Sequence, residues 1–213
     1  MGSLRAAEVF RRHALLIGGL VTVVALVVGY LAGLLTPRLG VPGDDSPEAG
    51  FARDMSVHHA QAVEMAMVAW QKSTNEEVRE IAYDIATGQQ AQIGIMQTWL
   101  VDWHLSPTGT RPKMAWMPGG SKELLPDGRM PGMASDDEIN QLHAATGRSL
   151  DVLFCQLMLR HHLGGIHMVD ELLTLTKNKQ VVDLATQMKN AQQNEVTNLR
   201  RLLNDLGAQP LSG

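Results

Sequence analysis

Two stretches of the chain repeat one pattern: FARDMSVHHAQAVEMA at residues 51–66 and FCQLMLRHHLGGIHMV at residues 154–169. Shifting the sequence by 103 residues superimposes them without a gap, and the same offset keeps aligning identical or apolar residues as far as Asp102 and Asp205. Helical periodicity alone would not favour a single offset across two successive helices, so the match indicates an internal repeat. Each copy carries a histidine pair, and the paired residues are His58, His59, His161 and His162.

Each copy of the repeat predicts a hairpin of two helices. Ser46 followed by Pro47 is typical of a helix start, and Thr74 to Glu77 indicates a capping box that opens the second helix of the first copy. The apolar residues that follow recur with a period near 3.6. One hairpin leaves an apolar stripe uncovered, whereas two can cover each other, so we expect an all-α fold, an antiparallel four-helix bundle. The expected bundle domain spans residues 47–207, with the two repeats at 47–104 and 150–207.

The N-terminal part of the chain predicts a membrane span. Residues 14–35 carry no charge over 22 positions, which is long enough to cross a bilayer as a helix and longer than a typical signal-peptide core. Three arginines precede this segment and acidic residues follow it, so the positive-inside rule places residues 1–13 in the cytoplasm. We expect an uncleaved, single-pass anchor in the plasma membrane. A Pro/Gly-rich linker at residues 36–46 then leads to an extracytoplasmic C-terminal domain.

Composition excludes several classes of protein. Hydrophobic residues make up 45% of the 213 residues and charged residues 19%, which argues against intrinsic disorder. The formal net charge of −4 gives no basic surface for nucleic acid. Cys155 is the only cysteine in the sequence, so neither an internal disulfide nor a cysteine-rich zinc or iron–sulfur site can form.

The paired histidines lie on or beside the apolar face of their helices. At 100° per residue, His58 shares a face with Met55 and Met65, and the second copy repeats this arrangement. One interpretation is structural, with hydrogen-bonded core histidines and methionines that fill space. Two pairs in register favour metal binding instead, because burying four imidazoles without partners would cost on the order of 1–3 kcal/mol each. The expected ligands are His58, His59, His161, His162, Met55, Met65, Met158 and Met168.

Three further residues fall in the same helical columns as the histidines. An acidic residue stands 11 positions before the second histidine of each pair, and a cysteine stands between them in the second copy. For the cysteine alone, an inert buried thiol is the alternative. The possible auxiliary ligands are Glu48, Asp151 and Cys155.

The ligand types favour copper among the candidate metals. Methionine favours Cu(I), and histidine accommodates both Cu(I) and Cu(II). Zinc seldom uses thioethers. A di-iron bundle would need Glu-x-x-His, and the sequence contains none: Glu64 is followed at the third position by Met67, and Glu171 by Thr174.

The segment between the repeats adds four methionines in two Met-x-x-Met pairs. Residues 105–134 contain five prolines and predict a long loop, and a short helix is expected at residues 135–147. On such a loop we expect the methionine side chains to be exposed, with no core to fill. They would then be auxiliary Cu(I) ligands, with Trp116 as a cation–π neighbour. The loop methionines are Met114, Met117, Met130 and Met133.

These motifs resemble the bacterial domain-of-unknown-function family 305. The resemblance covers about residues 47–207 and rests on the two M-x-x-H-H motifs with MPGMASDDEINQLHAATG, residues 130–147, between them. It implies a ferritin-like four-helix bundle in an exported protein and, for some members, copper binding linked to copper resistance. The family's repeats usually continue H-H-x-x-A, whereas the second copy here has Gly164-Gly165.

We therefore expect a membrane-anchored, extracytoplasmic protein that binds copper for sequestration or transfer without catalysing a reaction. The alternative is a non-catalytic accessory subunit of a membrane protein complex, in which the histidines are structural. A redox enzyme that uses bound copper ranks last, because nothing in the sequence resembles a substrate pocket. The expected partners are a copper ion, the membrane and a subunit of a membrane complex, without nucleic acid.

Overall fold

The structure is a computed structural model that describes residues 2–35 and 40–211. Residues 36–39, at the start of the expected linker, lie outside the described residues. The chain divides into two compact units, Met1–Val41 and Pro42–Gly213.

The first unit contains one long helix, α1 (Gly2–Leu35). Within it, Arg11–Leu34 is long and apolar enough to cross a membrane, judged by length and composition. The helix also includes most of the segment expected to lie in the cytoplasm, so the apolar stretch is the C-terminal part of a longer helix.

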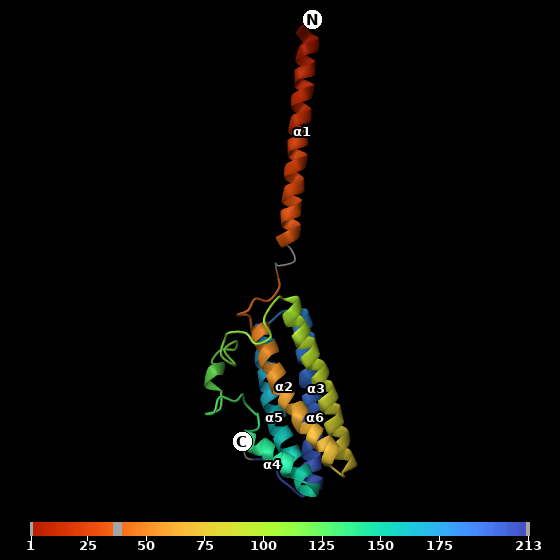
Figure 1. Ribbon diagram of the computed structural model, residues 1–213, viewed down its shortest axis with the longest axis vertical. Helices are drawn as coiled ribbons and strands as arrows, with labels where there is room; N and C mark the ends of the chain where they lie inside the picture. Colours follow the sequence, from red (N-terminus) through yellow and green to blue (C-terminus); the bar gives the residue numbers. More distant parts are fainter. Residues whose placement is uncertain (1, 36–39, 212–213) are drawn as a thin grey trace. The chain divides into compact units, whose positions relative to one another are not determined.

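The second unit is a bundle of four long helices, as Figure 1 shows. Two of them, α2 and α3, form one hairpin, and α5 and α6 form the other. The described part of the chain contains helices and no strand, which confirms the prediction of an all-α four-helix bundle. The bounds are α2 (Pro47–Lys72), α3 (Glu76–Asp102), α5 (Gly147–Leu175) and α6 (Lys179–Asp205).

Two repeat-related contacts join the hairpins at opposite ends of the bundle. At the end of α2, the Ser73 hydroxyl donates a hydrogen bond of 2.6 Å to Asp151, near the start of α5. At the end of α5, the Thr176 hydroxyl donates to Glu48, near the start of α2. Thr176 stands 103 residues after Ser73, and Asp151 stands 103 residues after Glu48, so the two contacts are equivalent in the repeat. Since each helix start meets the other helix's end, α2 and α5 are antiparallel.

The second helix of each hairpin begins after an asparagine. The side chains of Asn75 and Asn178 accept hydrogen bonds from the second and third NH groups of α3 and α6. Thr74 therefore lies one residue outside the helix, and the predicted capping box does not form, because the N-cap is Asn75 and the third helical residue is Val78. Asparagine is as good an N-cap as a hydroxyl residue, because its side-chain oxygen reaches the same free NH groups.

The segment between the hairpins runs along α2 and α5 (Figure 1). It contains the short 3₁₀ helix η2 (Gly120–Lys122) and the helix α4 (Asp136–Ala144). Ser135 caps α4 in the predicted capping box with Glu138. The helix α5 already begins at Gly147, three residues before the expected start of the second repeat at 150.

Candidate metal site

The four paired histidines lie halfway along the bundle, between two hydrophobic clusters. The first cluster includes Met65 of α2 and Phe154 of α5. The second includes Phe51 of α2 and Leu172 of α5, from the opposite halves of the same helices. The histidines are at most 1% exposed, and one glutamine from α3 and one from α6 are buried between the same clusters. We call these six side chains the central polar layer: His58, His59, His161, His162, Gln89 and Gln192.

His58 of α2 and His161 of α5 meet where the two hairpins pack together. Their ring centroids lie 3.8 Å apart, with the ring planes tilted by 36°. This contact shows that the two histidine-bearing helices are adjacent. It also places one histidine of each pair within reach of the same metal ion.

His59 and His162 each contact a polar side chain of the other helix in their own hairpin. His59 Nε2 lies 2.8 Å from Gln92 Oε1, and His162 Nε2 lies 2.6 Å from Glu195 Oε2. Gln92 and Glu195 are related by the 103-residue offset, so the contact belongs to the repeat. Because a carboxylate only accepts hydrogen bonds, Nε2 of a neutral His162 carries the proton and Nδ1 presents a lone pair.

The loop between the hairpins covers His58. Its Nε2 donates a hydrogen bond of 3.1 Å to the carbonyl oxygen of Pro131. A Cβ on Gly164 would overlap that same carbonyl oxygen, and a Cβ on Gly132 would lie 2.6 Å from the carbonyl oxygen of Arg160. Glycine at these two positions therefore lets the loop backbone lie directly on α5, over the histidines.

Each of the four imidazoles has one ring nitrogen with no hydrogen-bond partner among the residues that the structure describes. The second ring nitrogen is held in each case, that of His161 by the backbone of His58. Histidines that bind metals have this arrangement, in which one nitrogen fixes the ring and the other coordinates. We call the four atoms the open ring nitrogens: Nδ1 of His58, His59 and His162, and Nε2 of His161.

Burial keeps three of these imidazoles neutral, those of His58, His59 and His161. Loss of solvation lowers the pKa of His58 to about 4 and the pKa of His59 to about 3. The pKa of His161 also lies well below its usual value, first because of burial and then because of the neighbouring histidines. Neutral imidazole is the form that binds a metal, so at pH 7 these three rings need not lose a proton to coordinate one.

The expected methionine ligands flank the histidines in two groups. Met55 and Met168 lie in the second hydrophobic cluster, and Met65 and Met158 in the first, all of them fully buried. Across residues 2–35 and 40–211, no three side chains of His, Cys, Asp or Glu gather in a group able to hold a metal ion. A metal in the central polar layer would therefore need a donor of another kind beside imidazole, either thioether sulfur or amide oxygen.

The structure does not bring Glu48 and Asp151 to the histidines. Each lies at an end of the bundle, where it accepts the hydroxyl hydrogen bond described above. Their 11-residue separation from the histidine in the same column corresponds to about 16 Å of helical rise. Cys155 is buried in the first cluster, and burial raises the pKa of its thiol to about 12. The thiol is therefore protonated and unreactive in the metal-free protein.

The prediction that the loop methionines are exposed is wrong. Met114 and Met130 are fully buried, Met117 is 4% exposed and Met133 is 8% exposed. All four lie in the second hydrophobic cluster together with Met55. The loop packs on the bundle and adds to this second cluster, so a core position explains these methionines as well as a ligand role does.

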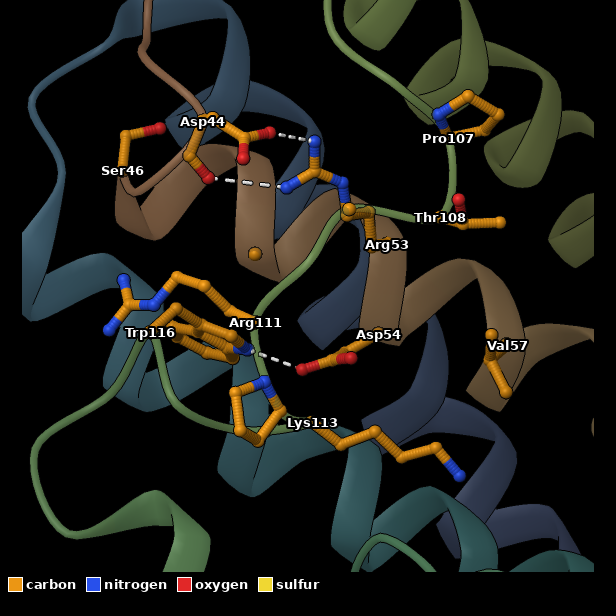
Figure 2. Close-up of a pocket in the computed structure, with 13 residues that line it drawn as sticks. Asp44, Ser46, Arg53, Asp54, Val57, Pro107, Thr108, Arg111, Lys113 and Trp116 are labelled. Carbon is orange, nitrogen blue, oxygen red and sulfur yellow. Dashed lines mark hydrogen bonds and ion pairs between the residues drawn. The ribbon is translucent and has the colours of Figure 1, made fainter.

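A buried aspartate that the sequence patterns did not single out anchors this loop. Asp54 Oδ2 accepts a hydrogen bond of 2.7 Å from the Met114 NH and one of 2.9 Å from Trp116 Nε1, and Figure 2 shows the second. Burial raises the pKa of Asp54, although both hydrogen bonds act to lower it. The sequence did carry a signal, namely an acidic residue four positions before His58 on an otherwise apolar face.

The pocket beside this anchor has a volume of about 210 Å³ and is drawn in Figure 2. Arg53, which lines this pocket, is already paired within the protein, because its guanidinium binds Asp44 and the Ser106 carbonyl. Trp116 packs edge-on against Phe51, with ring centroids 5.7 Å apart. The structure therefore places Trp116 in the loop anchor.

Two further histidines tie the connecting segment to the bundle surface. His143 of α4 lies 3.2 Å from Glu64 of α2, and His167 of α5 lies 2.7 Å from Glu123 of the loop. Their side chains are 50% and 42% exposed. Both histidines are therefore paired at the partly solvated surface of the bundle.

The fold and the buried histidines define a class, a duplicated-hairpin helical bundle with four imidazoles in its core. The chain belongs to the family described as Domain of unknown function (DUF305), which matches residues 48–203. The family resemblance inferred from the sequence is thereby confirmed. No curated protein matches the chain.

Solved structures from this family share the fold. A DUF305 protein from Streptomyces coelicolor, assigned as secreted, is 38% identical with a TM-score of 0.73, and the match covers 80% of this chain and 100% of that one. A DUF305 fragment from Deinococcus radiodurans is 30% identical with a TM-score of 0.60, covering 76% and 95%. CopM in its Cu(II)-bound form is 26% identical with a TM-score of 0.60, covering 75% and 97%.

Proposed function

We propose that this protein binds copper outside the cytoplasm, for sequestration or transfer rather than for catalysis. The observation that carries the proposal is the set of four open ring nitrogens in one buried layer. Leaving such nitrogens buried and unpaired costs about 1–3 kcal/mol each, and a bound metal ion removes that cost. The similar protein CopM has been solved with Cu(II) bound.

The methionines on either side of the layer favour copper over zinc. Met55 and Met168 lie beyond the histidines toward one end of the bundle, and Met65 and Met158 toward the other. A thioether is a soft donor that suits Cu(I), while imidazole suits Cu(I), Cu(II) and zinc. Imidazole combined with thioether therefore favours copper.

Two observations support the proposed location, one from α1 and one from the family. The apolar stretch Arg11–Leu34 is long enough to act as a membrane anchor, and arginines precede it. The Streptomyces coelicolor relative is assigned as secreted. In our proposal the helix holds the bundle on the outer face of the plasma membrane, beside a membrane protein that donates or accepts copper.

A different observation favours a second function. Each paired histidine also makes a hydrogen bond within the bundle, as structural histidines do. On this reading the protein is a non-catalytic accessory subunit of a membrane complex, and the polar layer only fixes the register of the helices.

Metal retention separates these two functions. The full-length protein in detergent is loaded with Cu(I), Cu(II) or Zn(II), desalted, and analysed for metal content. We expect the wild type to retain copper, and a variant with all four paired histidines changed to glutamine to lose it. The matched control changes the surface residues His143 and His167 to glutamine and should retain copper as the wild type does. A wild type that retains no copper would favour the accessory-subunit function.

The role of the methionines has its own test. Changing the four methionines that flank the histidines to leucine nearly preserves core volume, so the bundle should stay folded. We expect this variant to lose most of its Cu(I) affinity, measured by competition with a chromophoric chelator. Unchanged Cu(I) affinity would show that the methionines only fill the core, and zinc would then compete equally as the natural ligand. The residues changed are Met55, Met65, Met158 and Met168.

A further inference from the structure

Two members of the central polar layer, Gln89 and Gln192, take no part in the site described so far. Their side chains are 4% and 3% exposed. Neither polar atom of the Gln89 amide, nor Oε1 of Gln192, has a hydrogen-bond partner among residues 2–35 and 40–211. We call these two side chains the open amides. They occupy the same position in the two repeats, 103 residues apart, which indicates a shared role.

The register of the hairpins places the open amides beside the histidines. In the second hairpin His162 of α5 is bonded to Glu195 of α6. Because these helices are antiparallel, the residue one turn further along α5, Gly165, faces the residue one turn back along α6, Gln192. The structure shows this contact directly, since a Cβ on Gly165 would lie 2.6 Å from Gln192 Oε1.

Gly165 also explains how the amide oxygen reaches the layer. It lies four residues after His161, on the same face of α5, where the first repeat has Ala62. The missing Cβ leaves room for the Gln192 oxygen against the α5 backbone. In the second copy, Gly165 replaces the alanine of the H-H-x-x-A pattern and so makes space for this oxygen. In the first hairpin Gln89 stands at the same repeat position, and there Ala62 takes the place of Gly165.

The amides differ in chemistry from the methionines. A thioether is a soft donor and suits Cu(I), whereas imidazole nitrogen combined with oxygen in a tetragonal set suits Cu(II). The same four imidazoles thus have soft sulfur toward both ends of the bundle and amide oxygen from α3 and α6. A site built in this way can serve both oxidation states of copper with different partners for the histidines.

We propose that Gln89 and Gln192 supply oxygen ligands with which the histidine layer holds Cu(II). This proposal rests on the copper-binding function proposed above and assigns the two oxidation states to different donors. The amides are the Cu(II)-specific part of the site, and the flanking methionines are the Cu(I)-specific part.

The test replaces both glutamines with methionine, which is unbranched, has about the same length and carries sulfur in place of the amide. In the full-length protein, Cu(II) affinity should fall about tenfold or more, as is usual when a metal site loses supporting groups. Cu(I) affinity should stay the same or rise. The matched control makes the same change at the exposed neighbours Gln90 and Gln193, and should leave both affinities unchanged.

Thermal unfolding of the metal-free proteins gives a second readout. The double variant of Gln89 and Gln192 should be as stable as the wild type or more stable, because two unpaired buried amides are removed. A lower unfolding temperature would show that the amides stabilise the core by themselves, and would overturn the proposal. Unchanged Cu(II) affinity would overturn it too, while leaving the copper function intact. Only a wild type that retains neither Cu(I) nor Cu(II) would refute the copper function itself.

Discussion

The asymmetry between Gln92 and Glu195 gives a sharp test of the histidine layer. Both side chains hold the Nε2 of a buried histidine at the same position of the repeat, but one is neutral and the other is a carboxylate. A carboxylate acceptor makes the opposite ring nitrogen more basic and a stronger metal ligand. The substitution Glu195→Gln therefore converts the second hairpin's contact into the one that the first hairpin already has.

The structure sets the expected size of the effect. His162 is fully buried and the Glu195 side chain is only 19% exposed, so solvent screens the carboxylate weakly. In Glu195→Gln, the new amide replaces the 2.6 Å contact between His162 and Glu195 with one like the 2.8 Å contact between His59 and Gln92. The substitution should therefore preserve the fold. Losing such a supporting group typically lowers metal affinity about 10–100-fold. That range corresponds to roughly 1.4–2.8 kcal/mol of binding free energy.

The assay is competition for copper between the protein and a chromophoric chelator, with metal-free thermal unfolding as a check on folding. Glu195→Gln should weaken copper binding by this factor, and the reciprocal Gln92→Glu should strengthen it. The matched control is Asn198→Asp, which changes the charge by one unit in the surface groove beside Glu195 without touching a histidine. Equal copper affinities in the wild type, Glu195→Gln and Gln92→Glu would refute coordination by these rings.

The buried histidines, the buried thiol and the close approach of the loop to α5 can each be tested. Below pH 6.5 the unfolded chain protonates its histidines, while His58 and His59 stay neutral down to pKa values of about 4 and about 3. The free energy of unfolding of the metal-free protein should therefore be highest above pH 6.5 and lower by roughly 2 kcal/mol per histidine at pH 5. Equal urea-unfolding midpoints at pH 7.5 and pH 5 would contradict this. The Cys155 thiol, with its pKa raised to about 12, should resist alkylation at pH 8 until the protein is unfolded, and rapid labelling of the native protein would show that it is accessible. Gly164→Ala should destabilise the protein by roughly 1–3 kcal/mol, because the new Cβ overlaps the loop backbone. The new Cβ in Gly165→Ala meets only a side-chain amide, so this variant should be destabilised less. Equal shifts in unfolding temperature for the two variants would count against the loop geometry.

The fold could be predicted from the sequence because its signals are local and repeated. The 103-residue offset aligns helix caps, apolar stripes and histidine pairs, and the structure reproduces the equivalence even at the contacts of Ser73 and Thr176 with the opposite hairpin. The N-cap of α3 is Asn75 and not the neighbouring Thr74, because amide and hydroxyl side chains cap a helix equally well.

The loop could not be placed from the sequence, because its core is formed by long-range contacts. Met114 and Met130 stand in a Pro/Gly-rich segment that predicts exposure, and they are buried only because Asp54 and Pro131 dock the loop on α2 and over His58. No helical periodicity marks such a contact.

The polar layer was predicted only in part. The histidines stand out as repeated pairs, whereas Gln89 and Gln192 look like solvated helix residues until packing shows that they are buried. A buried glutamine has no pattern of its own in a sequence, because glutamine is common on exposed helix faces.

X-ray absorption spectroscopy of the full-length protein, loaded with one equivalent of Cu(I) and desalted, decides whether the paired histidines hold copper. We expect retained copper with imidazole nitrogen and thioether sulfur as its nearest neighbours, and loss of the imidazole signal in the variant with all four paired histidines changed to glutamine. Copper that washes off the wild type, or that shows the same neighbours with and without the four histidines, would contradict this expectation.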